Sequence, residues 1–239
     1  MLPDEGFIER EIELELGIQA AVCVAQEPAG PPELTLGELA RFKRLAGGPR
    51  RDSWLRGRKA LKKLLVRLGV RPDTAGISFP NPRFSLTHSG DFAVAVGADD
   101  PGVARGADCP GVAVGAGLHR PRLRGIGVDL ELGRFPAPRS ASFFLTDGER
   151  RHVDRLPPVQ QSETLLRLWT IKEALFKANP SNRMTWFTHY ALEAPDLRTG
   201  SAAVAAGPEE GRTPGLRFTS LRVQSGYLAF AICLGTCQP

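Results

Sequence analysis

An internal repeat constrains the fold of this 239-residue chain more than any other feature of its sequence. Three short stretches of the first half recur in the same order in the second half. The pairs are 34–45 with 145–156, 58–63 with 172–177, and 89–96 with 225–232. The repeat predicts an α+β fold of two similar halves, residues 1–124 and 125–239, related by a pseudo-twofold axis. We expect a functional site at their junction, where pockets commonly form.

Periodicity and turn signals predict the elements of the first half. A helix is expected to begin at a Thr35 cap and run to residue 45, and residues 51–68 predict a second helix with one basic and one apolar side. Two strands, 83–87 and 92–97, flank a turn at residues 89–90.

The segments outside this pattern are interpreted as strands or loops. Acidic and apolar residues alternate from Glu11 to Leu16, so residues 8–25 predict one or two strands. Residues 98–124 and 195–215 are rich in Gly and Pro and predict loops, the second of them before the last hairpin.

Residues 162–178 predict one long helix that carries charge within an apolar pattern. Ser162 is its expected N-cap, and Asn179 and Pro180 end it. Glu173 and Lys177 are four residues apart and are therefore neighbours on the helix surface. A solvated surface pair is the alternative to a functional role for these two residues.

Residues 125–131 predict a strand with two carboxylates on one face. Alternation directs Asp129 and Glu131 to the same side, where they repel each other unless a cation or water separates them. Carboxylate oxygens suit Mg²⁺, which keeps several waters and shares its coordination with substrate phosphates. The alternative is an exposed edge strand with acidic side chains.

Composition limits the class of protein. The chain has no run of about eighteen apolar residues and no signal peptide at Met1, so we expect a soluble, cytoplasmic protein without a membrane partner. Its four cysteines are scattered, which disfavours structural zinc and a disulfide framework. A net charge of +5 favours an anionic partner, but it does not choose between a nucleic acid, a nucleotide cofactor and an acidic protein.

Three motifs together resemble the 4′-phosphopantetheinyl transferases, of the monomeric two-half type that activates surfactin synthetase. Residues 127–131 resemble the family's GxDxE motif, and residues 169–177 its W(S/T)xKEAxxK motif. Residues 84–90 resemble a strand that ends in Ser-His-Ser, with Thr87 where the family usually has serine. The resemblance implies transfer of the 4′-phosphopantetheine arm of coenzyme A to a serine of an apo acyl or peptidyl carrier protein, with release of 3′,5′-ADP.

The resemblance also implies roles for individual residues. Asp129, Glu131 and Glu173 would hold Mg²⁺, and Glu173 or a water would deprotonate the carrier serine. Contacts to the coenzyme would come from Lys177 at the phosphates, from Thr87 and His88 at the adenosine phosphate end, and from Arg51 and Arg58. The family's Gly-Lys-Pro is replaced here by residues 79–83, with Arg83 as the substitute.

Two other classes of function compete with this one. A nucleic-acid-binding module would use the basic helix 51–67, but aromatic residues are sparse there and no nucleic-acid motif is present. A scaffold protein without catalysis would leave the acidic residues unexplained. We therefore expect a monomeric transferase that binds no nucleic acid.

Overall fold

The computed structural model describes residues 2–45, 47–98, 122–133, 135–204 and 215–235. Its helices are α1 (Glu5–Leu16), α2 (Leu36–Lys43), α3 (Pro49–Arg67), α4 (Asp147–Asp154) and α5 (Pro158–Ala178), with short 3₁₀ turns η1 (Pro31–Glu33), η2 (Pro138–Phe143), η3 (Asn182–Met184) and η4 (Phe187–His189). Its strands are β1 (Ala21–Ala25), β2 (Phe84–Ser89), β3 (Phe92–Gly97), β4 (Leu123–Leu132), β5 (Tyr190–Leu192), β6 (Thr199–Val204), β7 (Gly215–Val223) and β8 (Gly226–Leu234).

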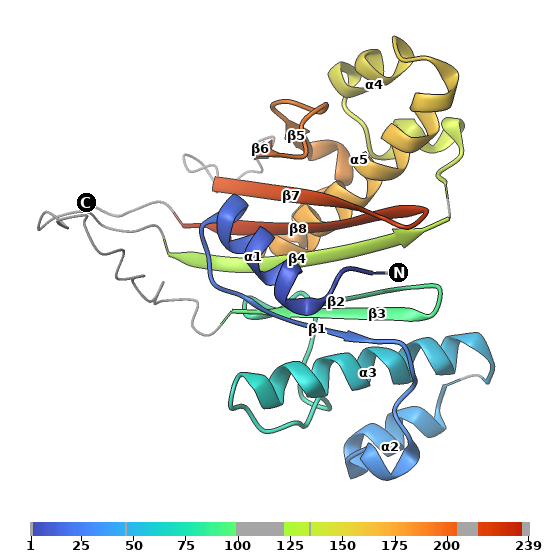
Figure 1. The fold of residues 1–239 in the computed structure, drawn as a ribbon, viewed down its shortest axis with the longest axis vertical. Helices are drawn as coiled ribbons and strands as arrows, with labels where there is room; N and C mark the ends of the chain where they lie inside the picture. Colours follow the sequence, from blue (N-terminus) through green and yellow to red (C-terminus); the bar gives the residue numbers. More distant parts are fainter. Residues whose placement is uncertain (1, 46, 99–121, 134, 205–214, 236–239) are drawn as a thin grey trace, which may run out of the picture.

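The strands form two antiparallel sheets, which confirms the predicted α+β class. One sheet has the order β1-β3-β2 and the other the order β4-β8-β7-β6-β5. In Figure 1, α3 packs on the smaller sheet, α5 on the larger sheet, and α1 crosses the face that both sheets turn away from these helices. No helix in the described ranges is both long and apolar enough to cross a membrane.

The predicted helices and hairpins are present, but the long helix α5 begins earlier than predicted. Thr35 caps α2 as predicted, and its hydroxyl and Glu38 form a capping box. The long helix α5 begins at Pro158, and not after Ser162. Proline suits the first turn because the N–H that it lacks has no partner there anyway, so the helix extends one turn further back.

The predicted strand at 8–16 is wrong, because this segment forms α1. Asp4 caps the helix by accepting from the backbone N–H of Phe7 at 2.9 Å. The side chains of Ile8, Ile12 and Leu16 are buried at a spacing of four, which is helical spacing. The alternation of acidic and apolar residues suggested a period of two, but burial follows the longer period.

The predicted loop at 195–215 is also partly wrong. Residues 199–204 form β6, which pairs with β7 and with the short strand β5. Residues 205–214 lie outside the described residues, as do residues 99–121 of the predicted loop 98–124. The last two residues of the predicted loop 98–124, Leu123 and Arg124, belong to β4.

The two sheets meet where β2 lies beside β4. The hydroxyls of Ser85, Thr87 and Ser89 accept hydrogen bonds from backbone N–H groups of β4, in each case 43 residues further along the chain. This constant separation means that β2 and β4 run parallel. Apolar residues of both sheets share one core under α1. Side chains, and not backbone pairing, therefore join the halves at this seam.

Several polar contacts recur in the two halves, as the internal repeat predicts. The first helix of each repeat has a capping box at corresponding positions, Thr35 with Glu38 and Thr146 with Glu149. Each of these buried glutamates also accepts from a lysine of the following long helix at 2.8 Å, although the two lysines, Lys62 and Lys172, are not at corresponding positions: the repeat aligns Lys172 with Arg58. A second lysine on each long helix donates to a strand carbonyl: Lys63 to Val24 at 3.4 Å and Lys177 to Val128 at 3.2 Å.

Candidate functional site

Two glycines of β4 allow α5 to lie directly on the strand. A Cβ atom added at Gly127 would overlap the carbonyl oxygen of Ala174, and one at Gly125 would overlap that of Ala178. This close approach brings the side of α5 that carries Glu173 and Lys177 against the strand that carries Asp129. Gly127, the glycine of the GxDxE motif, and Gly125, two residues before it, therefore have a packing role.

Asp129 lies at the seam between the sheets and is buried, with 5% of its surface exposed. Its Oδ1 accepts from the Thr87 hydroxyl at 3.0 Å and from the Lys177 ammonium at 2.6 Å. Its Oδ2 is buried and has no hydrogen-bond partner. One oxygen is thus fixed by two donors, while the other has an uncompensated partial charge in a poorly solvated place.

Glu131 and Glu173, the other two predicted ligands of Mg²⁺, lie near Asp129. These three residues are called the acidic trio or the acidic cluster below. Glu131 accepts from the indole N–H of Trp169 at 3.3 Å. Burial raises the pKa of Glu173 to about 7; Lys177 opposes this shift, and the charges of Asp129 and Glu131 add to it. The three residues are therefore close enough for their negative charges to act on one another.

The donor set of this cluster fits a hard divalent cation. Across the described ranges, no three His, Cys, Asp or Glu side chains are already arranged around a common metal position, and Asp129 and Glu131 accept from different donors. The unpartnered Oδ2 of Asp129 and the raised pKa of Glu173 nevertheless indicate an excess of negative charge. A cation with oxygen preference, such as Mg²⁺, would neutralise it.

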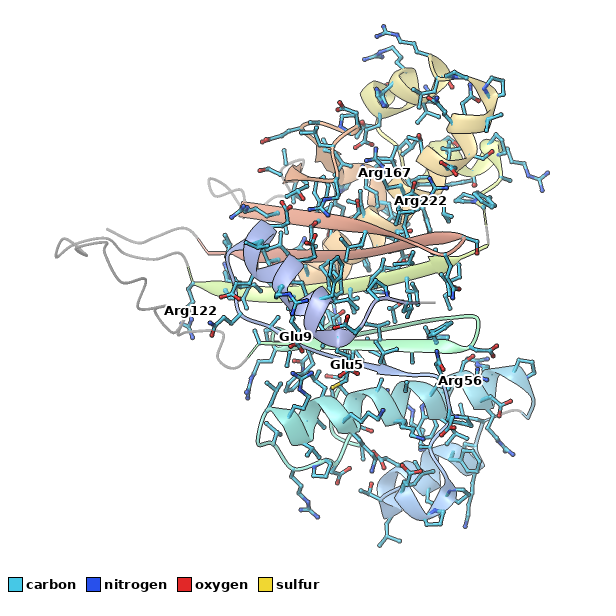
Figure 2. All side chains as sticks on the ribbon, in the orientation of Figure 1. Glu5, Glu9, Arg56, Arg122, Arg167 and Arg222 are labelled. Carbon is cyan, nitrogen blue, oxygen red and sulfur yellow. The ribbon has the colours of Figure 1, made fainter. Side chains whose placement is uncertain are left out.

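His88 lies beside this cluster at the end of β2. Burial, together with the charges of Lys177 and Arg56, lowers the pKa of His88, while Asp129 opposes the shift. Arg56 reaches the β2–β3 hairpin from α3 (Figure 2), where its guanidinium pairs with Asp91 at 3.2 Å. Within the described part of the chain, Lys177 contacts the acidic cluster directly, while Arg56 lies close enough to His88 for its charge to act on that ring.

A sequence model of the 4′-phosphopantetheinyl transferase superfamily matches residues 125–231. Over this segment, which is less than half of its length, the chain is similar to members of that superfamily. Two curated relatives are each 31% identical to it over 140 residues: 4′-phosphopantetheinyl transferase AcpT of Escherichia coli O157:H7 and of Escherichia coli strain K12. The alignments cover 54% of this chain and 58% of each relative, so the chain spans less than two thirds of their length.

The superfamily segment contains the acidic trio and Lys177 but none of the predicted contacts of the first half. Thr87 is buried, and its hydroxyl is used within the protein, between Asp129 and the N–H of Leu130. The structure thus shows two contacts of Thr87 within the protein, and its contact with the coenzyme stays a prediction. The side chain of His88, in contrast, reaches solvent, although the protein surrounds enough of its ring to lower its pKa.

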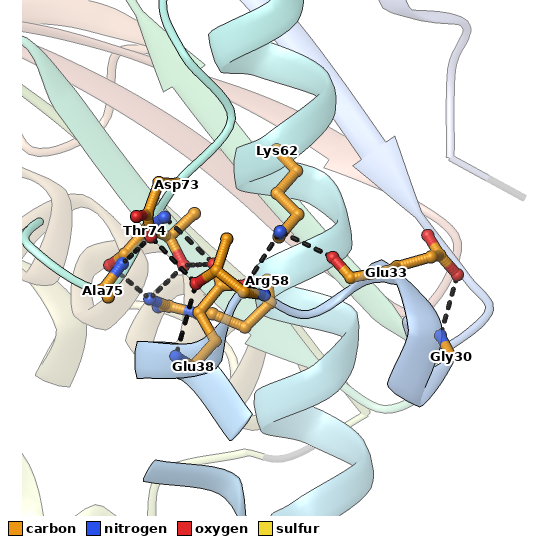
Figure 3. Close-up of polar contacts among 9 residues, drawn as sticks. Gly30, Glu33, Glu38, Arg58, Lys62, Asp73, Thr74 and Ala75 are labelled. Carbon is orange, nitrogen blue, oxygen red and sulfur yellow. Dashed lines mark hydrogen bonds and ion pairs between the residues drawn. The ribbon is translucent and has the colours of Figure 1, made fainter. Parts of the chain in front are cut away.

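The three arginines that the superfamily resemblance suggested lie elsewhere. Arg58 is 7% exposed and donates to the hydroxyl of Thr74 at 3.1 Å, next to the buried Glu38 (Figure 3). Arg51 lies over the ring of Phe42, and Arg83 stands at the opposite end of β2 from His88. The structure does not bring these arginines to the acidic cluster.

The same observations weaken the nucleic-acid alternative. The basic side of α3 is used in internal contacts: Arg58 as described, Arg56 with Asp91, and Arg67 with Glu5 and Glu9. A surface for phosphates needs cations that are free of such partners. Helix α3 thus stabilises the first half.

Sequence reasoning missed two residues that neighbour the site. Trp169 belongs to the W(S/T)xKEAxxK motif, but the resemblance assigned it no role, whereas in the structure its N–H donates to Glu131. Arg56 lies on α3 with Arg51 and Arg58, the two arginines that the resemblance suggested. The position of Trp169 in the motif, one turn before Glu173, was an available signal. No sequence signal pointed to Arg56, since its partner Asp91 belongs to a distant hairpin.

Proposed function

We propose that this protein transfers the 4′-phosphopantetheine arm of coenzyme A to the hydroxyl of a serine in an apo carrier protein, with Mg²⁺ and with release of 3′,5′-ADP. The observation that carries the proposal is the meeting of Asp129, Glu131, Glu173 and Lys177 in the segment that matches the superfamily. The proposal covers acyl and peptidyl carriers of fatty-acid, polyketide and peptide synthesis, and a cytoplasmic monomer.

The reaction replaces the phosphoanhydride bond of coenzyme A by a phosphate ester bond to serine. The serine oxygen forms a bond to the phosphorus that carries pantetheine, and the bond from this phosphorus to the oxygen of 3′,5′-ADP breaks. The serine proton passes to Glu173, directly or through a water that Glu173 orients. Lys177, already beside Asp129, donates to the diphosphate and steadies the charge of the leaving group.

The carboxylates of Asp129, Glu131 and Glu173 would hold the cation. When bound, Mg²⁺ neutralises charge on the diphosphate and helps to align it with the attacking oxygen. His88 is the residue that faces the adenosine phosphate end, and the positive charge of Lys177 lies close enough to act on it. Trp169 holds Glu131 in place by its hydrogen bond.

Glu173→Gln tests this proposal. The substitution keeps the shape and helix propensity of the side chain, so stability should change by no more than about 1 kcal/mol. Transfer should fall at least about a hundredfold, the usual loss for a general base or a metal ligand. The assay incubates each protein with coenzyme A, saturating Mg²⁺ and a panel of apo carriers, and reads the mass of the intact carrier.

Glu163→Gln is a matched control on the same helix. Glu163 forms an exposed ion pair with Arg222, 2.7 Å apart, and such pairs contribute little to stability. This variant should transfer at the rate of the unchanged protein. If Glu173→Gln also does so, Glu173 takes no part in the reaction and the assignment of the acidic trio is wrong.

A further inference from the structure

The seam between the sheets contains one hydroxyl that differs from its neighbours. Ser85, Thr87 and Ser89 lie at alternate positions of β2, and each accepts a backbone N–H of β4, at 3.0, 3.2 and 3.0 Å. Ser85 and Thr87 are both buried, with 2% and 4% of their surface exposed. The three residues therefore have the same structural task of satisfying the edge of β4.

Thr87 has a second contact, which fixes where its hydroxyl hydrogen points. Because the oxygen already accepts from the N–H of Leu130, its own hydrogen is free to be donated elsewhere. The acceptor is Oδ1 of Asp129, at 3.0 Å. A hydroxyl that is held from one side by the backbone can orient a carboxylate on its other side.

This contact determines which oxygen of Asp129 is available. Oδ1 accepts from both Thr87 and Lys177, while Oδ2 is buried without a partner. The carboxylate cannot rotate without breaking two hydrogen bonds, one of them to a charged group. Of the two oxygens of Asp129, only Oδ2 is thus left without a protein donor.

We propose that Thr87 is a positioning residue for the cation site, which holds Asp129 so that Oδ2 faces the divalent cation. This inference rests on the proposed function, because that function supplies the cation. It assigns to the seam a role beyond joining the two sheets: the hydrogen bond that couples β2 to β4 also sets the orientation of a metal ligand.

The test compares three variants at the seam. Thr87→Val removes the hydroxyl and keeps the shape, Thr87→Ser keeps the hydroxyl, and Ser85→Ala removes an equivalent hydroxyl that has no contact with Asp129. Binding of Mn²⁺, which substitutes for Mg²⁺ and gives a paramagnetic signal, is measured by titration with and without coenzyme A. Thermal unfolding of each variant is recorded in parallel.

We expect Thr87→Val to weaken Mn²⁺ binding about 10- to 100-fold, the range for loss of a hydrogen bond to a metal ligand. Thr87→Ser should bind Mn²⁺ like the unchanged protein, and so should Ser85→Ala, although Ser85→Ala and Thr87→Val should lower the melting temperature similarly. Equal Mn²⁺ affinity in Thr87→Val and the unchanged protein would overturn the role of Thr87 alone. An unchanged protein that binds no Mn²⁺ under either condition would overturn the cation site and the proposed function with it.

Discussion

Replacing Gly127 by alanine should separate α5 from β4 and thereby disturb the site. The added Cβ would overlap the carbonyl oxygen of Ala174 and crowd the backbone nitrogen of Ala178. Nonbonded heavy atoms pack best about 3.5 to 4.0 Å apart, so helix and strand must separate by about 1 Å or more. Both obstructing atoms belong to the backbone, and no side-chain rotation can relieve the overlap.

Two losses should follow from this separation. Overpacking of this kind costs about 1 to 3 kcal/mol, which corresponds to a fall of about 2 to 12 °C in melting temperature for a chain of this size. A shift of about 1 Å in Glu173 and Lys177 relative to Asp129 should reduce transfer about a hundredfold. Thermal unfolding and the carrier mass assay measure the two effects on the same preparation.

Gly148→Ala is the control, because a Cβ at that position has its nearest neighbour, the Thr146 hydroxyl, at 3.9 Å. Gly148 is near the start of α4, so alanine should leave transfer unchanged and should stabilise the fold by up to about 1 kcal/mol. If Gly127→Ala keeps both the melting temperature and the transfer rate of the unchanged protein, contact between α5 and β4 does not set the geometry of the site.

Two further predictions concern buried charge. Lys172 is fully buried and pairs with Glu149 at 2.8 Å, so Lys172→Met should lower the free energy of unfolding by about 3 to 5 kcal/mol, and adding Glu149→Gln should recover part of it. Denaturant unfolding measures this; simple addition of the two single losses would contradict a coupled pair. In metal-free protein, the pKa of Glu173 is about 7 when folded and near 4.5 when unfolded, so the folded state binds the proton more tightly. Its free energy of unfolding should therefore fall, by at most about 3 kcal/mol, as pH rises from 4.5 to 7, and Glu173→Gln should lack this dependence when unfolding is followed in chelator.

The sequence by itself determined the elements whose signals are local. The Thr35 cap, the helix over 51–68 and the strand over 125–131 follow from residues within a few positions of one another. The carboxylates of Asp129 and Glu131 could be assigned to one strand face, and Glu173 and Lys177 to one helix face, because periods of 2 and 3.6 residues fix these relations. The internal repeat and the motifs then predicted that the two faces meet.

Only the tertiary structure decided what depends on partners far along the chain. Residues 8–16 form a helix because Ile8, Ile12 and Leu16 bury together on a core shared by both sheets, although their alternation also suits a strand. Arg58 and Arg56 lie on the same helix and both have partners within the protein, but Arg58 is buried beside Thr74 while Arg56 reaches Asp91 in the hairpin next to His88. Burial and the position of distant partners decide which contacts a charged side chain makes, and spacing along one element determines neither.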